Sequence, residues 1–252
     1  MSLSSREAEL VRLPVARETQ DPTGAPPAPG TGKPLVALTL AEMRYDDGTL
    51  VLGGFDLTLR AGETLAITGP SGVGKSTLLR ILAGLETRYT GTLQMPDRVA
   101  MVFQEPTLLP WRSARDNIRL ATGLSSAGAL DALAEVGLAD HASQYPTQMS
   151  LGQQRRLSLA RAFGSAPDVL LLDEPFVSLD PELAEEMMVL FARLRAARGL
   201  ATVLVTHVEA EAKMLASRIV TLSGSPARLG EERQNKGAYF QLSASGVTSS
   251  KS

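Results

Sequence analysis

One loop motif constrains this chain more than any other feature of its sequence. Residues 69–77 read GPSGVGKST and fit the pattern G-x-x-x-x-G-K-[ST], directly after the apolar run 64–68 and directly before a helical pattern over 77–83. Glycines in this order let backbone N–H groups surround phosphate oxygens, and the N-terminus of the following helix adds favourable partial charge. A glycine-rich turn that matches by chance is the weaker alternative. The motif predicts a nucleotide phosphate site in an α/β fold.

The loop supplies the expected ligand contacts. Lys75 brings a positive charge for the β- and γ-phosphates, and the hydroxyl of Ser76 can ligate Mg²⁺. A nucleotide with Mg²⁺ is therefore the expected ligand. The predicted contacts in this loop are Gly69, Pro70, Ser71, Gly72, Val73, Gly74, Lys75, Ser76 and Thr77.

Two acids follow an apolar strand further along the chain. Residues 169–172 read VLLL, and Asp173 and Glu174 come directly after them. Open α/β sheets bind ligands at the carboxyl ends of their strands. Asp173 therefore suits the Mg²⁺ shell, through a water, and Glu174 is placed to polarise an attacking water. The alternative is a solvated acidic strand end, which the phosphate loop makes less favourable.

Composition narrows the class of protein. A chain of 252 residues that is 44% hydrophobic can build a sizeable core, and a net charge of −2 with scattered Lys and Arg gives no footprint for nucleic acid. The absence of cysteine excludes disulfides and thiolate metal sites, and two histidines leave little scope for a His metal site. No apolar run approaches the roughly 20 residues that span a bilayer. We therefore expect a cytoplasmic protein whose membrane role, if it has one, comes through a partner.

Domain boundaries are suggested by composition. Residues 1–34 are expected to be a disordered extension, because their last part is dominated by Pro, Gly, Ala and Thr. Residues 35–225 are expected to form one domain with a helical subdomain over about 107–163, and residues 226–252 a C-terminal tail. The predicted strands are 35–40, 51–59, 64–68, 99–103, 169–172 and 201–205.

The predicted fold class follows from these runs. The last two strands are continuously apolar, as in a parallel sheet covered on both faces. Asp180 and Pro181 open a helix that Gly199 closes. We predict an α/β fold, a P-loop NTPase core with a mainly parallel sheet, a β-rich N-terminal subdomain and a helical insertion.

With both nucleotide motifs in place, about residues 35–225 resemble the ATP-binding subunit of an ABC transporter. Tyr45 stands where this family stacks an aromatic ring on adenine, although an ordinary strand-end tyrosine is the alternative. Gln104 in VFQEP matches the Q-loop glutamine, which touches the metal and the attacking water. Ser178-Leu179-Asp180 matches the D-loop, and Asp180 is also a suitable helix N-cap. The resemblance implies that the nucleotide is ATP.

A histidine late in the chain extends the resemblance. His207 follows the strand 201–205 and corresponds to the switch histidine that contacts the γ-phosphate. A lone histidine is more often a surface or core residue, but the other motifs occur in the family's order. The family usually has an acid after this histidine, whereas this chain has Val208 followed by Glu209. That departure raises the question of what else holds this loop.

The segment MSLGQQRR, residues 149–156, aligns with the family's signature motif, usually Leu-Ser-Gly-Gly-Gln. Ser150 and Gln153 also fit the capping box S-x-x-Q, so a plain helix start is the alternative. Leu151 is then the first helical residue, where leucine is allowed, and Gly152 the second, where a missing Cβ would let phosphate approach. The resemblance implies that Ser150, Gly152 and Gln153 contact the ATP of a second subunit. Leu151 is expected to slow or weaken that ATP sandwich.

The resemblance also implies a mechanism. Two ATPase subunits would pair head to tail, with Glu174 as base and with His207 and Lys75 holding the γ-phosphate. Gln104, Ser76 and Asp173 would face Mg²⁺.

Residues 103–118 resemble the Q-loop region of importers for nitrate, aliphatic sulfonates and taurine, especially at Leu109-Pro110-Trp111. This implies a peripheral subunit at the cytoplasmic face of the inner membrane that powers import of a small anionic solute. Its partners would be a second ATPase subunit, integral-membrane permease subunits and a periplasmic solute-binding protein, without nucleic acid. Trp111 would be exposed at the permease surface, or would pack in the helical insertion. A soluble ABC-type ATPase not coupled to transport and a low-turnover regulatory ATPase remain alternatives.

Overall fold

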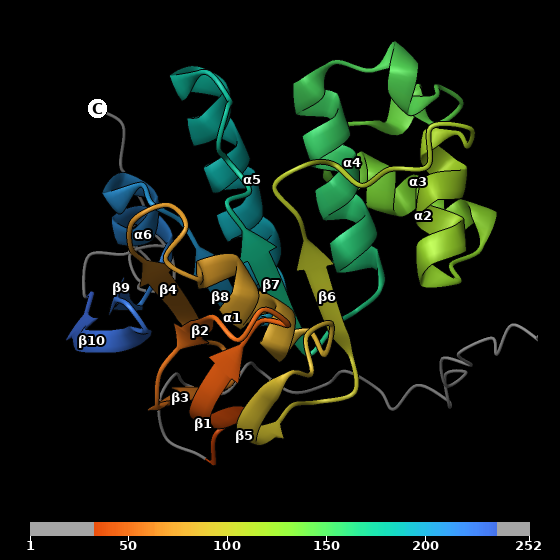
Figure 1. The fold of residues 1–252 in the computed structure, drawn as a ribbon. Coiled ribbons are helices and arrows are strands. Elements are labelled where there is room, and N and C mark those ends of the chain that lie inside the picture. Colours follow the sequence, from red (N-terminus) through yellow and green to blue (C-terminus); the bar gives the residue numbers. More distant parts are fainter. Residues whose placement is uncertain (1–32, 236–252) are drawn as a thin grey trace, which may run out of the picture.

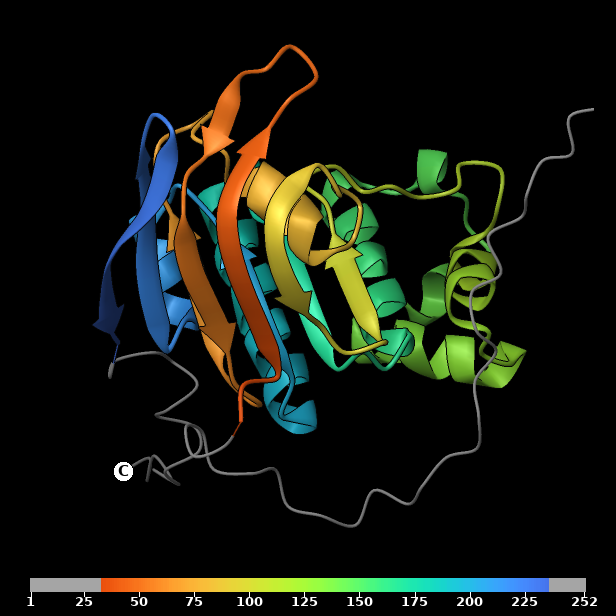
Figure 2. The same cartoon turned by 60° about the horizontal axis from the view of Figure 1, so that its bottom comes forward.

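The computed structural model describes residues 33–235 (Figure 1). The extension predicted for residues 1–34 lies almost wholly outside the described residues, as does the chain after residue 235. The described part contains one ten-stranded sheet, with helices against it and a helical subdomain to one side (Figure 2). None of its helices is long and apolar enough to cross a membrane.

The sheet has a parallel part and an antiparallel part. The parallel strands run in the order β9-β4-β8-β7-β6, and β1 pairs antiparallel with β2, β3 and β5. Strand β10 joins the two parts, because it pairs antiparallel with β9 and parallel with β2. The strands are β1 (Val36–Arg44), β2 (Leu50–Leu52), β3 (Phe55–Leu59), β4 (Thr64–Thr68), β5 (Tyr89–Gln94), β6 (Val99–Val102), β7 (Val169–Asp173), β8 (Ala201–Val205), β9 (Arg218–Gly224) and β10 (Ala227–Gln234).

Helices cover both faces of the parallel part, which is why β7 and β8 are buried along their whole length. On one face, Leu171 and its alternate neighbours pack with α1 (Lys75–Leu82), which lies between the parallel strands and the antiparallel strands. On the other face, Leu170 and Leu172 pack with α4 (Leu151–Gly164) and α5 (Pro181–Arg198). Helix α6 (Glu209–Leu215) lies against β4. The predicted α/β class is confirmed.

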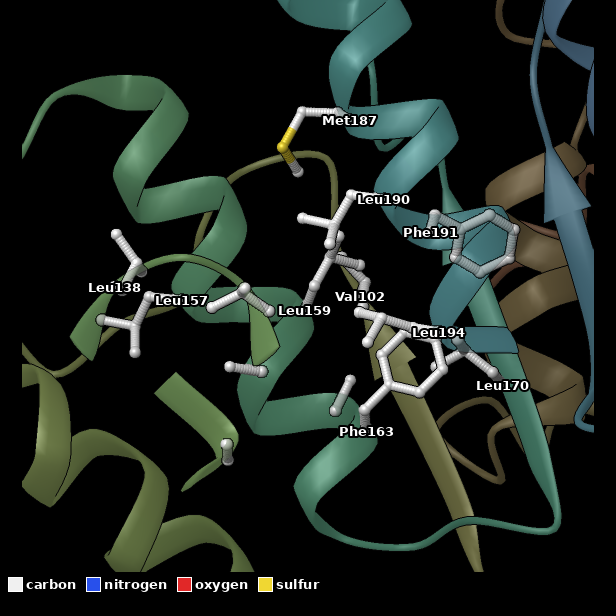
Figure 3. Close-up of a cluster of buried hydrophobic side chains, with 14 of the residues drawn as sticks. Val102, Leu138, Leu157, Leu159, Phe163, Leu170, Met187, Leu190, Phe191 and Leu194 are labelled. Atoms are coloured by element: carbon white, nitrogen blue, oxygen red, sulfur yellow. The ribbon is translucent and has the colours of Figure 1, made fainter. Parts of the chain in front are cut away.

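Helix α4 connects the helical subdomain to the sheet. The subdomain contains α2 (Ala114–Thr122), α3 (Ser126–Glu135) and two short 3₁₀ turns, Ala139–His141 and Pro146–Gln148. In Figure 3, Leu157 of α4 lies toward Leu138, and Phe163 lies toward α5. The rings of Phe163 and Phe191 are 6.2 Å apart between centroids. Because α4 packs with both the subdomain and the sheet within one hydrophobic cluster, displacement of the subdomain displaces α4 against the sheet.

Several element boundaries differ from prediction. The run 51–59 is two strands, β2 and β3, because the chain bends at Gly53 and Gly54. Helix α1 starts at Lys75 rather than at residue 77. Strands β5, β9 and β10 were not predicted. Strands β5 and β10 are largely exposed and polar, whereas β9 is mostly buried and its apolar residues were a usable signal. The domain boundary at residue 225 is wrong, because β10 lies inside the sheet between β9 and β2 rather than in a tail.

A buried amide holds the loop that presents Trp111. Asn117 on α2 is 1% exposed, and its Nδ2 donates to the carbonyls of Leu109, Arg112 and Ser113 at 3.0–3.1 Å. Its Oδ1 accepts from the backbone N–H of Leu109 at 2.8 Å. Trp111, within this clamped loop, is 68% exposed. Of the two placements considered from the sequence, the exposed one is confirmed.

We expect Asn117→Ala to lower the free energy of unfolding by on the order of 2 kcal/mol, because it leaves buried backbone groups without partners. Urea denaturation of the full chain measures the change, and hydrogen exchange at Leu109 should accelerate. Leu120→Ala, on the exposed side of the same helix, is the control and should change stability little. Equal stability of the two variants would show that the clamp does not hold the loop.

Candidate functional site

The phosphate loop passes very close to the sheet, and two of its glycines are required for that approach. Gly69 has φ +147°, and a Cβ there would lie 2.3 Å from the carbonyl oxygen of Leu222 on β9. Gly74 has φ +110°, and a Cβ there would lie 2.9 Å from Cδ2 of Leu52 on β2. The loop is therefore fixed against strands from both parts of the sheet.

Lys75 closes the loop on itself. Its buried ammonium donates to the carbonyls of Gly69 and Pro70, each at 2.9 Å. The same Nζ lies 3.6 Å from Oε1 of Glu174. The positive charge of Lys75 is thus held beside the loop and close to the carboxylate of Glu174, which follows β7. That Lys75 contacts the nucleotide phosphates stays a prediction.

Strand β7 brings Asp173 next to the loop. The hydroxyl of Ser76 donates to Oδ1 of Asp173 at 2.9 Å. Burial raises the pKa of Asp173, the hydrogen bond from Ser76 opposes the rise, and the neighbouring charge of Glu174 adds to it. A buried carboxylate beside a hydroxyl is a pair of oxygen donors suited to Mg²⁺. No cluster of three or more His, Cys, Asp or Glu that could hold a metal occurs among residues 33–235.

Glu174 lies between a lysine and a histidine. Its Oε2 is 3.2 Å from Nδ1 of His207, while its Oε1 faces Lys75. Its backbone has φ +46°, a left-handed conformation that is uncommon for a residue with a side chain. The backbone N–H of Glu174 donates to the carbonyl of Val205 at 2.9 Å, which fixes β7 and β8 at the point where both strands end. The structure brings together Lys75, Glu174 and His207, which are more than 130 residues apart in sequence at their extremes.

The loop forms one wall of a hollow of about 700 Å³. This volume is in the range of small-molecule sites. The predicted residues that line it are Tyr45, Pro70, Ser71, Gly72, Val73, Gly74, Lys75, Ser76, Thr77, Gln104 and Glu174. The hydroxyl of Tyr45 lies 2.8 Å from Oγ1 of Thr77, so an aromatic ring borders the same hollow.

The lining also contains residues that were not predicted. They are Thr49, Leu50, Val51, Arg80, Gly224 and Ser225. The turn signal at Asp46-Asp47-Gly48 could have pointed to residues 49–51, because the strand after that turn leads toward the loop. No local signal points to Gly224 and Ser225, which reach the hollow only through the pairing of β10 with β2.

Five predicted nucleotide contacts do not line this hollow: Gly69, which packs on β9, and Ser150, Gly152, Gln153 and Asp180. Asp173 and His207, predicted for the metal and the γ-phosphate, are not part of its lining either. Ser150 caps α4, where its Oγ accepts from the N–H of Gln153 at 3.2 Å and Oε1 of Gln153 accepts from the N–H of Ser150 at 2.9 Å. This confirms the capping box. Asp180 caps α5 by accepting from the N–H of Leu183 at 3.0 Å. These residues and Gly152 lie at helix starts outside the hollow of their own chain.

Gly152 has a packing role that was not predicted. A Cβ at this position would lie 3.0 Å from Cδ2 of Leu183, so the glycine allows α4 to pack closely on α5. That its missing Cβ also leaves room for a phosphate stays a prediction. The adjacent Leu151 is 43% exposed, as its first helical position predicts.

The loop around His207 is held from the following helix. The hydroxyl of Thr206 donates to the buried carboxylate of Glu211 on α6 and accepts from the N–H of Val208 at 3.0 Å. Burial raises the pKa of Glu211, while the hydrogen bond from Thr206 lowers it. Glu211 thus supplies an acid close to the loop of His207, in which Val208 stands where an acid was expected. Sequence reasoning missed this residue, although its place four residues after His207 on a short helix was a usable signal.

A phosphate loop after one parallel strand, with acids at the end of the next strand but one in the same sheet, defines a P-loop nucleoside triphosphatase. The ABC transporter family matches residues 52–177, half of the chain. The chain is 42% identical to the aliphatic sulfonates import ATP-binding protein SsuB 1 of Mesorhizobium japonicum, over 80% of each chain. It is 44% identical to a protein of the same description in Rhodococcus jostii, over 75% of this chain and 80% of the relative.

A solved structure agrees with these relatives. The dimeric, post-hydrolysis ATP-binding cassette MJ0796, bound to ADP and Pi, is 29% identical with a TM-score of 0.70. It aligns with 80% of this chain and 99% of its own. The chain belongs to the ABC transporter family. It binds ATP and is an ATP hydrolase of that family.

The raised pKa of Asp173 gives a signed stability prediction. A carboxyl whose pKa is higher in the folded than in the unfolded state loses stability as pH rises through the raised value, because the ionised form is disfavoured by folding. Nucleotide-free Asp173→Asn should therefore melt at a higher temperature than the wild type at pH 7. Differential scanning fluorimetry measures this, with the exposed Asp97→Asn as control. A lower melting temperature for Asp173→Asn alone would contradict the burial argument.

Proposed function

We propose that this chain is the ATP-hydrolysing subunit of an importer for aliphatic sulfonates. The observation that carries the proposal is identity of 42–44% to two sulfonate import ATP-binding proteins over at least three quarters of the chain. The segment around Leu109-Pro110-Trp111 supports the same family of importers, which also includes carriers of taurine and nitrate. No feature of the described residues favours a soluble or a regulatory ATPase.

We assign the chemistry to the groups around Glu174. Its carboxylate acts as the base that orients and deprotonates the attacking water, and Lys75 and His207 hold the γ-phosphate on either side. Mg²⁺ would be held by Ser76 and Asp173 with Gln104 nearby, and when bound it would neutralise charge that develops on the phosphates. Tyr45 stacks on the adenine from the edge of the hollow.

The ATP site is completed by a second copy of the subunit. Ser150 lies at an exposed helix N-terminus and, with Gly152, Gln153 and Asp180, outside the hollow of its own chain. A capped helix N-terminus is an anion site, which suits the phosphates of a partner's ATP. The dimeric arrangement of the solved relative supports this pairing. Leu151, exposed beside this N-terminus, adds bulk where the two subunits meet.

The coupling to transport runs through the loop that carries Trp111. Asn117 holds the backbone on either side of this exposed ring, at the edge of the helical subdomain and on the segment that begins with Gln104. We place the permease on this surface and the chain at the cytoplasmic face of the inner membrane. A periplasmic binding protein would deliver the sulfonate from the other side.

Glu174→Gln should abolish turnover while keeping ATP bound. The amide cannot accept the proton of the attacking water, so we expect the hydrolysis rate to fall by at least 100-fold. Phosphate release measures the rate, and size-exclusion chromatography with Mg-ATP should show a stable dimer. Full turnover in this variant would remove Glu174 as the base.

The identity of the transported solute can be tested by growth of the organism that encodes the chain. Deletion of the gene should abolish growth with an alkanesulfonate as the sole sulfur source and leave growth on sulfate unchanged. The wild-type gene should restore growth, and Glu174→Gln should not. Trp111→Ala should lower sulfonate uptake and permease capture while the purified subunit keeps its ATPase rate. Loss of growth on taurine or of nitrate use, with sulfonate growth retained, would redirect the assignment to that solute.

A further inference from the structure

A buried arginine on α4 reaches two segments of the ATP site. Arg155 is 5% exposed, and its guanidinium donates to the backbone carbonyl of Gln104 and, at 3.4 Å, to that of Val177. Burial lowers the pKa of Arg155, and the charge of Glu105 opposes this. A guanidinium stays charged in proteins, so a cation is held inside the domain largely by carbonyl oxygens.

The two carbonyls lie in segments that carry residues of the proposed ATP site. Gln104 follows β6 and lines the hollow, and Val177 lies in the turn that runs from Glu174 to Ser178. Both ends of that turn are strained, because Glu174 has φ +46° and Ser178 has φ +63°. Left-handed conformations at residues with side chains are unfavourable and persist only where surrounding contacts impose them.

The turn from Glu174 to Ser178 is held by one hydrogen bond within it and by contacts from other elements. Within the turn, the N–H of Val177 donates to the carbonyl of Glu174 at 3.3 Å. From outside, Val205 accepts from the N–H of Glu174, Phe176 is buried beside Phe191, and Arg155 donates to Val177. The contact from Arg155 differs from the others, because the same side chain also donates to the carbonyl of Gln104. The planar fork of arginine can donate to two carbonyls at once, whereas a lysine ammonium is a single point of contact.

We propose that Arg155 is a positioning residue for ATP hydrolysis, which sets the turn of Glu174 and the backbone of Gln104 from one side chain on α4. This inference rests on the role of Glu174 proposed above. Because Ser150 caps the same helix, a shift of its N-terminus upon contact with the partner's ATP is passed to Arg155 within about one and a half turns. Glu174 is thus aligned when the second subunit has engaged.

Arg155→Met tests this inference, since it removes both hydrogen bonds and leaves no buried charge. We expect kcat for ATP to fall at least tenfold in the full chain, while the Kd for ATP in EDTA, measured by calorimetry, changes less than twofold. A loss confined to kcat is not expected from general unfolding, which would weaken ATP binding as well. Arg156→Gln is the matched control, because Arg156 is the next residue on α4 and pairs with Glu186 at 2.9 Å, away from the hollow. It should keep the wild-type kcat.

Arg155→Lys gives a second measurement, which still tests the inference if Arg155→Met does not fold. It keeps a buried cation that reaches one carbonyl, so its kcat should be reduced with an unchanged Kd. Wild-type kcat in the variants that fold, or equal losses in kcat and in ATP affinity, would overturn the positioning role. If Glu174→Gln keeps turnover, the proposed base is wrong. If Glu174→Gln is inactive and Arg155 variants are normal, only the inference about Arg155 fails.

Discussion

The parallel pairing of β4, β7 and β8 is the constraint on which the rest of this structure depends. Ile67 pairs with Val205, and Val205 pairs with Asp173 on its other side, so three strands end at one level of the sheet. The phosphate loop, the two acids and His207 each follow one of these ends. Because the strands are buried on both faces by α1 and by α4 and α5, their register cannot slip without exposing apolar side chains. Groups from distant parts of the sequence are therefore held within a few ångströms of each other.

The sequence was sufficient for features that are encoded locally. The loop at residues 69–77, the capping box at Ser150 and the cap at Asp180 each depend on a few neighbouring residues, and the structure has them where they were predicted. Strands β5 and β10 were missed because their exposed, polar residues carry no apolar alternation, and only distant pairing partners hold them in the sheet. The packing of Gly152 on Leu183 was missed for a related reason, since it depends on how two helices cross.

Helix α4 unites features that the sequence presents separately. Its N-terminus is capped by Ser150, its middle carries Arg155, and its far end packs Phe163 into the core beside α5. The helical insertion is accordingly not an appendage of the α/β core, because α4 packs with both the subdomain and the sheet in one hydrophobic cluster and takes part in the hydrogen bonding behind the site. The exposed loop with Trp111 adds an outer surface to the same unit through Asn117.

Strand β10 gives the end of the described chain an unexpected importance. It is inserted between β2 and β9, and Gly224 and Ser225, which precede it, form part of the wall of the hollow at the phosphate loop. A shortened or fused version of this subunit must therefore retain the chain through Gln234. Cutting it where the motifs end would open the nucleotide site and expose the edges of two strands that lie in the middle of the sheet, which is a known route to aggregation.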